Sequence, residues 1–247
     1  MSPDQDAKPI QSPRPAPPHH TPRMSPELAE QIRQWHERSY IAARREGVRE
    51  QTIDYLGTTI VVPPHVMPVT KVASLLGEAV LAEVQPGDVV LDIGTGSGVN
   101  AILAASRAAR VLAVDVSEEA IAAARANVQT NRVQAVVELR RSDVFSDVEG
   151  IFDLIIFDPP FRWFAPGDIL EAATTNEGYR AMTSFFATVK EHLSGKGRML
   201  IFSGTSGDLD YLRELFEHYG YTAEVLRQGS IARDQIQVDY FTFRVTP

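Results

Sequence analysis

The sequence predicts an α/β fold with a seven-stranded, mostly parallel sheet, preceded by a short extension that contains a helix and a hairpin. From Asp88 onward, short apolar runs alternate with helical segments, which is typical of a parallel sheet covered on both faces. The last two apolar runs lie close together in the chain, which favours an antiparallel C-terminal edge. The predicted strands comprise residues 89–93, 111–115, 133–139, 152–157, 198–202, 221–226 and 238–245.

The chain divides into three predicted segments at changes in composition. Residues 1–24 form a predicted disordered tail, because residues 1–23 hold seven of the sixteen prolines and almost no large apolar side chains. Residues 25–84 form a predicted cap that contains a helix and a hairpin. Residues 85–247 form the predicted main domain. Its helices comprise residues 100–108, 118–129, 179–193 and 208–219.

Local signals define the elements of the cap. Ser25-Pro26 is a helix start, with serine as N-cap and proline in the first turn, and Gly47 ends this helix. Residues 52–62 show partial alternation around Gly57, which predicts a short hairpin. A second helix is expected over residues 70–84.

Composition excludes several classes of protein. The chain has 247 residues, of which 44% are hydrophobic, as a packed core requires. It has no cysteine, which rules out disulfides, a thiolate zinc site and a cysteine nucleophile. It shows no signal core and no run of membrane-spanning length, so we expect a soluble, cytoplasmic protein with no membrane partner. The net charge of −8 argues against a nucleic-acid partner, although a local basic patch could still bind one.

A glycine-rich loop separates the first predicted strand from the helix that follows it. Gly94, Gly96 and Gly98 allow a sharp turn and the close approach of a ligand. The third glycine of a dinucleotide-binding loop would come one residue later, where this chain has Val99. Asp92 would repel a diphosphate at the helix N-terminus but suits the ammonium group of a methionine moiety.

A second carboxylate, Asp115, ends the next predicted strand, where such a group hydrogen-bonds the ribose of a nucleotide. This position fits NAD as well as S-adenosylmethionine, so the loop spacing and Asp92 discriminate between the two cofactors.

Over residues 85–205 the chain resembles the class I, Rossmann-like methyltransferases that depend on S-adenosylmethionine. The resemblance implies this cofactor, with S-adenosylhomocysteine as product. It also implies that the glycine loop holds the methionine moiety, that Asp115 binds the ribose, and that Val116 and the segment 142–144 contact the adenine. The candidate cofactor-binding residues are Asp92, Gly94, Thr95, Gly96, Gly98, Asp115, Val116, Asp143, Val144 and Asp158.

The fourth predicted strand ends in Asp158-Pro159-Pro160-Phe161. This tetrapeptide resembles the (Asn/Asp/Ser)-Pro-Pro-(Tyr/Phe/Trp) signature of amino-methyltransferases, and the chain is similar in this respect to the release-factor glutamine, or "small domain", group of N-methyltransferases. The resemblance implies that Asp158, Pro159 and Phe161 are the catalytic residues.

The chemistry of planar nitrogens explains these residue types. The lone pair of such a nitrogen is delocalised, and two acceptors, the Asp158 carboxylate and the Pro159 carbonyl, would orient it by taking N–H hydrogen bonds. Phe161 would stack on the planar group and stabilise its developing positive charge. The sulfonium makes methyl transfer favourable, so we expect no metal. Aspartate at the first motif position favours a more electropositive acceptor than asparagine does.

The segment 161–180 is the predicted lid over the acceptor. Its aromatic and acidic side chains could cage a cationic planar substrate, and an ordinary surface helix is the alternative. The candidate substrate-binding residues are Tyr40, Trp163, Phe164, Glu171, Glu177 and Tyr179.

Three functions are compatible with these patterns. The acidic charge and the compact N-terminal part favour an N-methyltransferase of a small molecule or an amino acid. The closest motif resemblance favours an N-methyltransferase of a macromolecule, acting on protein glutamine or on an RNA base. A non-catalytic module that binds S-adenosylmethionine is the third alternative. No sequence pattern indicates an oligomeric state.

Overall fold

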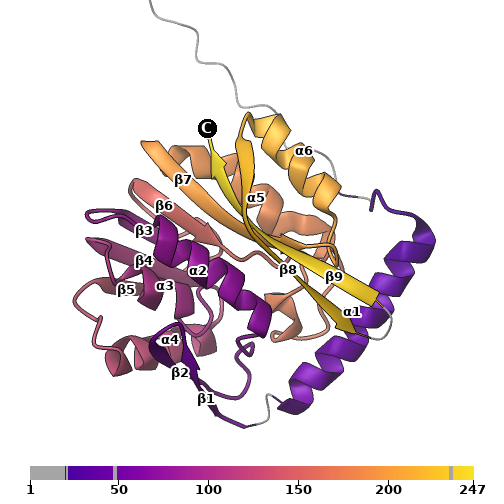
Figure 1. The fold of residues 1–247 in the computed structure, drawn as a ribbon, viewed down its shortest axis with the longest axis horizontal. Coiled ribbons are helices and arrows are strands. Elements are labelled where there is room, and N and C mark those ends of the chain that lie inside the picture. The colour runs from indigo at the N-terminus through magenta and orange to yellow at the C-terminus, as the bar shows by residue number, and fades with distance from the viewer. Residues whose placement is uncertain (1–19, 21, 47–48, 234–235) are drawn as a thin grey trace, which may run out of the picture.

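The computed structural model describes residues 20, 22–46, 49–233 and 236–247 (Figure 1). The strands are β1 (Gln51–Tyr55), β2 (Thr58–Val62), β3 (Val89–Ile93), β4 (Arg110–Asp115), β5 (Val137–Arg141), β6 (Phe152–Phe157), β7 (Leu193–Gly204), β8 (Thr222–Arg233) and β9 (Ile236–Thr246). The α-helices are α1 (Pro26–Glu46), α2 (Ser74–Glu83), α3 (Val99–Ala104), α4 (Glu118–Thr130), α5 (Arg180–Thr188) and α6 (Leu209–Tyr219). Short 3-10 helices cover Lys71–Ala73, Glu171–Ala173, Glu177–Tyr179 and Val189–Glu191.

Seven strands form the main sheet of the described residues, in the order β5-β4-β3-β6-β7-β9-β8. Strands β5, β4, β3, β6 and β7 are parallel, and β9 runs antiparallel between β7 and β8. The predicted sheet with an antiparallel C-terminal edge is therefore confirmed.

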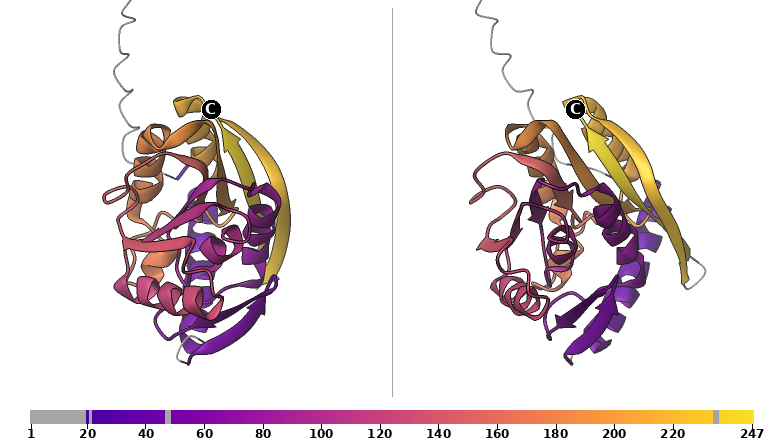
Figure 2. Two further views of the ribbon diagram at one scale, coloured as in Figure 1. Left: turned by 90° about the vertical axis from the view of Figure 1, so that its left-hand side faces the viewer. Right: turned by 60° about the vertical axis from the view of Figure 1, so that its left-hand side comes forward.

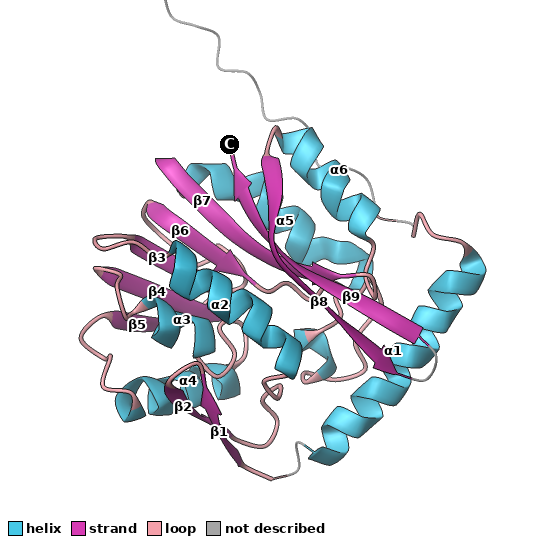
Figure 3. Ribbon diagram, viewed as in Figure 1, coloured by secondary structure: helices cyan, strands magenta, loops and turns pink. Residues whose placement is uncertain are grey.

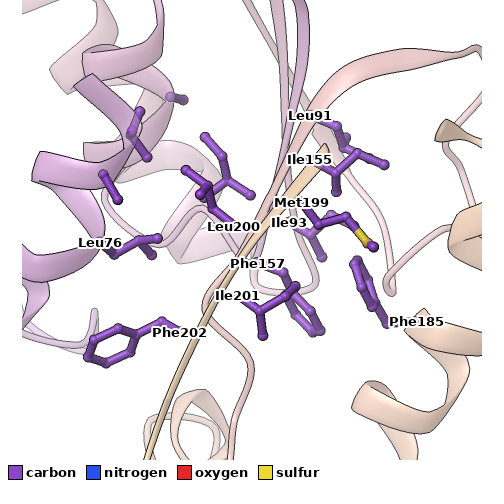
Figure 4. Close-up of a cluster of buried hydrophobic side chains, with 14 of the residues drawn as sticks. Leu76, Leu91, Ile93, Ile155, Phe157, Phe185, Met199, Leu200, Ile201 and Phe202 are labelled. Atoms are coloured by element: carbon purple, nitrogen blue, oxygen red, sulfur yellow. The ribbon is translucent and has the colours of Figure 1, made fainter. Parts of the chain in front are cut away.

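Helices cover both faces of this sheet (Figure 2). α2, α3 and α4 pack next to one another, and α5 packs against α6. The side chains of β7 alternate between the two faces, as the period of a strand requires. Figure 4 shows Leu200 and Phe202 on the side of Leu76 from α2, and Met199 and Ile201 on the side of Phe185 from α5. The continuous apolar runs that predicted these strands thus reflect burial on both faces.

The third predicted strand is displaced along the chain. The prediction placed it over residues 133–139, whereas β5 begins at Val137. Val133 instead belongs to the turn after α4, where its N–H donates to the Val128 carbonyl at 3.1 Å. Arg132 turns the chain with a φ of 58°. Partly buried valines in a turn give the same apolar pattern as the start of a strand.

The end of the predicted tail is packed against the domain. Residues 1–19 and 21, which hold most of this prediction, lie outside the described residues. His20 is different, because its Nε2 lies 2.7 Å from Asp208 Oδ2 and its ring contacts Tyr179 and Tyr211. The Arg23 N–H also donates to Asp208 Oδ2. The prediction of a tail that extends to residue 24 is therefore wrong at its end, because the acidic N-cap of α6 binds this segment.

The helix and hairpin of the N-terminal part form as predicted. The Leu28 N–H donates to Ser25 Oγ at 3.2 Å, which is an N-cap bond of α1. α2, which belongs to the predicted cap, packs against α3 and against β7 and β8 of the main sheet. The domain boundary after residue 84 stays a prediction. Within the described residues, no helix has both the length and the apolar character needed to cross a membrane.

Two asparagines, one in α4 and one directly after it, attach the hairpin of β1 and β2 to the domain. Figure 3 shows this hairpin beside α4. Asn127, which is fully buried, accepts from the Val61 N–H and donates to the Val61 carbonyl, both at 2.8 Å. Its amide also donates to the Ser97 carbonyl of the glycine loop at 2.8 Å. Asn131, one turn later, bonds the N–H and the carbonyl of Thr59. The two amides thus replace a neighbouring strand along the free edge of β2.

We expect Asn127→Ala to lower the free energy of unfolding by about 2–4 kcal/mol, because three buried hydrogen bonds are lost and backbone groups of Val61 and Ser97 are left unpaired. Urea denaturation would measure the change. Thr130→Ala, on the exposed side of α4, serves as the control and should change stability by less than about 0.5 kcal/mol. Equal effects of the two variants would contradict the role of Asn127.

Candidate active site

The candidate site lies where the order of the parallel strands changes direction. β3 pairs with β4 on one side and with β6 on the other, so the connections leave β3 and β6 in opposite directions. Ligands of open α/β sheets bind beyond the carboxyl ends of the strands at such a point. The glycine loop follows β3 and the Asp158 motif follows β6. A Cβ atom built on Gly94 would lie 3.9 Å from the Asp158 carbonyl oxygen.

All three glycines of the loop have positive φ, with values of 70° for Gly94, 54° for Gly96 and 87° for Gly98. Their surroundings differ. A Cβ on Gly98 would lie 3.1 Å from the Cβ of Ala124, so this glycine permits the close packing of α4. A Cβ on Gly96 would meet nothing within 4 Å. The space beside Gly96 is open, and the approach of a ligand to its backbone stays a prediction.

The buried carboxylate of Asp92 holds the glycine loop in place through hydrogen bonds. Its Oδ2 accepts hydrogen bonds from Thr95 Oγ1 at 2.6 Å and from the Ala101 N–H at 3.1 Å. Burial raises the pKa of Asp92 to about 7, and nearby Asp115 adds to the rise. The structure thus uses Asp92 and Thr95 to connect β3, the loop and α3, and a contact of Asp92 with the methionine ammonium stays a prediction.

Asp115, at the end of β4, also holds the glycine loop through a hydrogen bond. Its Oδ2 accepts from the Gly96 N–H and its Oδ1 from the Ser117 N–H, both at 2.9 Å. Burial raises the pKa of this carboxyl group. The neighbouring Val116 side chain is 51% exposed, which leaves an apolar surface at the mouth of the crevice.

The predicted adenine segment lies next to Asp115. The Ser142 N–H donates to the Asp115 carbonyl at 3.0 Å. Asp143 is exposed, whereas Val144 is buried with a φ of 52°, a rare conformation for a β-branched residue. Candidate residues from the ends of β3, β4 and β5 are therefore contiguous.

Asp158 differs from Asp92 and Asp115 because its carboxylate oxygens accept no hydrogen bond from the described residues. Its side chain is half-buried, yet no described residue donates a hydrogen bond to it. Burial raises the pKa of Asp158 to about 7, Asp92 adds to the rise, and Arg162 opposes it. Asp158 is thus a hydrogen-bond acceptor without a donor, beside the glycine loop.

Phe161 does not offer the free aromatic face that the sequence predicts. Its ring is buried and contacts Phe202 and Tyr240 edge-on. The Arg162 guanidinium carbon lies 4.9 Å from the ring centroid. The Phe161 carbonyl accepts from the Tyr179 hydroxyl at 2.9 Å. Stacking of Phe161 on a substrate therefore stays a prediction that requires Arg162 or the lid to move.

The predicted lid does not form an aromatic cage around an open pocket. Trp163, Phe164 and Tyr179 are buried, and the Trp163 ring contacts the other two. Hydrophobic packing against the rest of the molecule therefore occupies these aromatic rings. The predicted cage for a cationic substrate is therefore not present in this structure.

The polar candidates of the lid are also engaged or remote. Glu171 accepts from His36 Nε2 at 2.8 Å, and Tyr40 donates to Asp168, so both fasten the lid to α1. Burial, assisted by Arg162, lowers the pKa of His36 to about 4. Glu177 is exposed to solvent.

The burial of Arg162 next to the Asp158 motif was not predicted from the sequence. This side chain is only 7% exposed, and its guanidinium carbon lies 5.4 Å from the centroid of the Trp35 ring. An arginine directly after a tight turn has the local pattern of a surface residue. Its position at the end of the Asp158 motif was the one available signal.

The fold and the loop define a class I methyltransferase with a Rossmann-like sheet. The chain belongs to the "Methyltransferase small domain" family, whose profile matches residues 71–231. These findings and the structural match below identify it as a methyltransferase that depends on S-adenosylmethionine.

Curated relatives match parts of the chain. The ribosomal RNA small subunit methyltransferase C of Haemophilus influenzae (strain 86-028NP) is 36% identical over 141 residues, which cover 56% of this chain and 38% of the relative. The ribosomal protein L11 methyltransferase of Thermotoga neapolitana is 51% identical over 71 residues, which cover 28% of this chain and 26% of the relative. The chain thus spans well under half the length of these relatives.

Solved structures match the fold more completely. The structure of SMU.776, a methyltransferase complexed with SAH, superimposes with a TM-score of 0.61 at 16% identity. This match covers 79% of the chain and 56% of SMU.776.

The raised pKa of Asp158 predicts that Asp158→Asn gains stability relative to the wild type as the pH rises. The folded state keeps the proton up to about pH 7, whereas the unfolded chain releases it near pH 4. The wild type therefore loses stability between these values, and asparagine does not titrate. We expect the difference in unfolding free energy to shift by about 1–3 kcal/mol in favour of the variant between pH 4 and pH 8.

Urea denaturation at both pH values would measure this shift. Asp239→Asn is the control, because hydrogen bonds from Ser230 and Gln237 lower the pKa of Asp239, so its effect on stability changes mainly below pH 4 and it should show almost no shift between pH 4 and pH 8. A stability difference between Asp158→Asn and wild type that is the same at both pH values would contradict the raised pKa.

Proposed function

We propose that this methyltransferase acts on a planar nitrogen of a base in ribosomal RNA. The observation that carries the proposal is the carboxylate of Asp158, a residue whose backbone lies beside the glycine loop, because no described residue donates a hydrogen bond to this carboxylate. A half-buried acceptor that no described residue engages is available to an N–H group of the methyl acceptor.

The residues at the ends of β3, β4 and β5 would bind the cofactor. The open space beside Gly96 would admit the methionine moiety, and Asp115 would bind the ribose hydroxyls. Val116 and Val144 would contact the adenine. S-adenosylmethionine supplies an electrophilic methyl group on its sulfonium. The protein contributes by placing the acceptor nitrogen in line with that group.

Asp158 and Pro159 would perform this alignment. The Asp158 carboxylate and the Pro159 carbonyl would each take one N–H of the acceptor, which directs the nitrogen lone pair toward the crevice. Alignment of this kind contributes up to about 7–11 kcal/mol to catalysis. A pKa of about 7 leaves much of Asp158 ionised at neutral pH, so it can also receive the proton after methyl transfer.

The relatives support a macromolecular acceptor over the small molecule that the acidic charge favoured. The ribosomal RNA enzyme matches twice the share of this chain that the ribosomal protein enzyme matches, with 56% against 28%, which favours RNA. Charge distribution adds support. Residues 38–49, on α1 and just after it, contain Arg38, Arg44, Arg45 and Arg49 against one glutamate. Arg44 lies 3.6 Å from Asp168 of the lid, so this basic segment borders the site.

Transfer of a tritiated methyl group to ribosomal subunits, with RNA and protein separated afterwards, tests the acceptor. We expect label in the RNA and a rate that falls as salt increases. Label confined to the protein fraction, or to small molecules of a cell extract, would refute the RNA proposal.

In the same assay, Asp158→Ala should lower turnover by at least about tenfold to a hundredfold, because the acceptor nitrogen loses its orientation. Asp158→Asn keeps an acceptor oxygen and should retain more activity than the alanine variant. Calorimetry should show that cofactor affinity falls much less than turnover in both variants. Full turnover by Asp158→Ala would remove Asp158 from the mechanism.

Asp115→Ala should weaken binding of S-adenosylmethionine by about 1–3 kcal/mol, because the ribose hydroxyls lose a charged acceptor and the Gly96 N–H loses its partner. Isothermal titration calorimetry would measure this loss. Asp210→Ala, on the exposed surface of α6, is the control and should bind like the wild type. Equal affinity of Asp115→Ala and wild type would contradict the ribose role.

A further inference from the structure

The Arg162 guanidinium is a buried cation with few partners. It is 7% exposed and lies between two aromatic rings, 4.9 Å from the centroid of Phe161 and 5.4 Å from that of Trp35. Its Nη2 donates to Ser206 Oγ at 3.2 Å, whereas its Nε has no hydrogen-bond partner. Among the described residues, no carboxylate forms an ion pair with it.

This arrangement is unusual for a structural arginine. Buried arginines are paired with carboxylates, because an unpaired buried charge is unfavourable. Arg198 of the same chain follows the rule, since it forms ion pairs with Asp88 at 2.8 Å and with Glu83 at 3.4 Å. Arg162 therefore stands apart among the buried cations of the described residues.

A second donor without a partner lies in the side chain that Arg162 touches. Trp35 is 5% exposed, and its Nε1 has no hydrogen-bond partner. Trp35 belongs to α1 and Arg162 to the segment after β6, so two elements distant in the sequence bring together two side chains that each carry an unpaired N–H group. Buried donors are nearly always paired in folded proteins, and a ligand with acceptor atoms would pair these two.

The position of these donors relates them to the transfer site. Arg162 follows the motif directly and interacts electrostatically with Asp158. Asp158 offers an acceptor without a donor, and Arg162 and Trp35 offer donors without acceptors. A group with an N–H beside a carbonyl or phosphate oxygen would satisfy both sets. A guanidinium or ammonium acceptor would instead place a second cation beside Arg162.

We propose that Arg162 and Trp35 form the donor half of the acceptor site and bind an oxygen of the RNA nucleotide whose nitrogen Asp158 holds. This inference rests on the proposed function and deepens it. The oxygen belongs either to the base, as a carbonyl next to the methylated nitrogen, or to the phosphate of the same nucleotide. In both cases the site selects a neutral nitrogen that lies near an electron-rich oxygen.

The test compares Arg162→Met with Arg198→Met by thermal unfolding without substrate. Methionine fills the space between Phe161 and Trp35 without a charge, so we expect the melting temperature of Arg162→Met to equal or exceed that of the wild type. Arg198→Met leaves Asp88 without its ion-pair partner and removes one of the two arginines that pair with Glu83, so it should melt at least about 4 °C lower. A fall in Arg162→Met as large as in Arg198→Met would show a structural arginine and overturn the proposal.

Methyl transfer to ribosomal RNA provides the second readout. Arg162→Met should lose at least about tenfold in kcat/KM with unchanged cofactor affinity, and Arg162→Lys should recover part of this loss because it restores the charge. Transfer by Arg162→Met at the wild-type rate would overturn the proposal. Absence of RNA methylation by the wild type would refute the proposed function, and the melting comparison would still decide whether Arg162 is held for a ligand.

Inorganic phosphate distinguishes the two sources of the oxygen. If the oxygen is that of a phosphate, inorganic phosphate should raise the melting temperature of the wild type but not of Arg162→Met, relative to chloride at equal ionic strength. If it is a base carbonyl, phosphate should leave both proteins unchanged while the loss of transfer in Arg162→Met persists. An equal rise in both proteins would place phosphate elsewhere and assign the oxygen to the base.

Discussion

The Asp92 carboxylate receives the Thr95 hydroxyl and the Ala101 N–H on one oxygen, and this joint fixes the end of β3 relative to the loop and the start of α3. Because the carboxylate is buried, water does not compete for these bonds. Asp115 then holds the far side of the loop through the Gly96 N–H. Two of the three acidic groups at the strand ends, Asp92 and Asp115, thus hold the glycine loop through hydrogen bonds. The third, Asp158, keeps its oxygens available for chemistry.

The parts of the molecule that the sequence predicted well are those whose signals are local. The glycine loop and the Asp158 motif each occupy a short stretch of the chain. Their location at the ends of parallel strands follows from the topology. The start of α1 was equally local, because Ser25 and Pro26 are adjacent. The start of β5 was not, because Val133 is as apolar in a turn as in a strand.

The environment of the acceptor could not be predicted, because it depends on contacts between distant segments. Arg162 and Phe161 follow a turn, and their local pattern is that of exposed residues. In the structure Trp35 of α1 packs on Arg162, and Arg162 packs on Phe161. The aromatic residues of the lid carry the same local pattern whether they line a pocket or pack against a helix. The net charge also did not predict the local charge near the site. The value of −8 for the whole chain is compatible with the cluster of arginines in residues 38–49.

The hydrogen bonds of Asn127 connect the N-terminal hairpin to the glycine loop, so the hairpin is not a separable appendage. One side chain bonds both β2 and the carbonyl of Ser97. Chimeras that exchange this hairpin between relatives would have to transplant the matching face of α4 with it. Recombination within this family should therefore favour crossover points that keep β2 and α4 from the same parent.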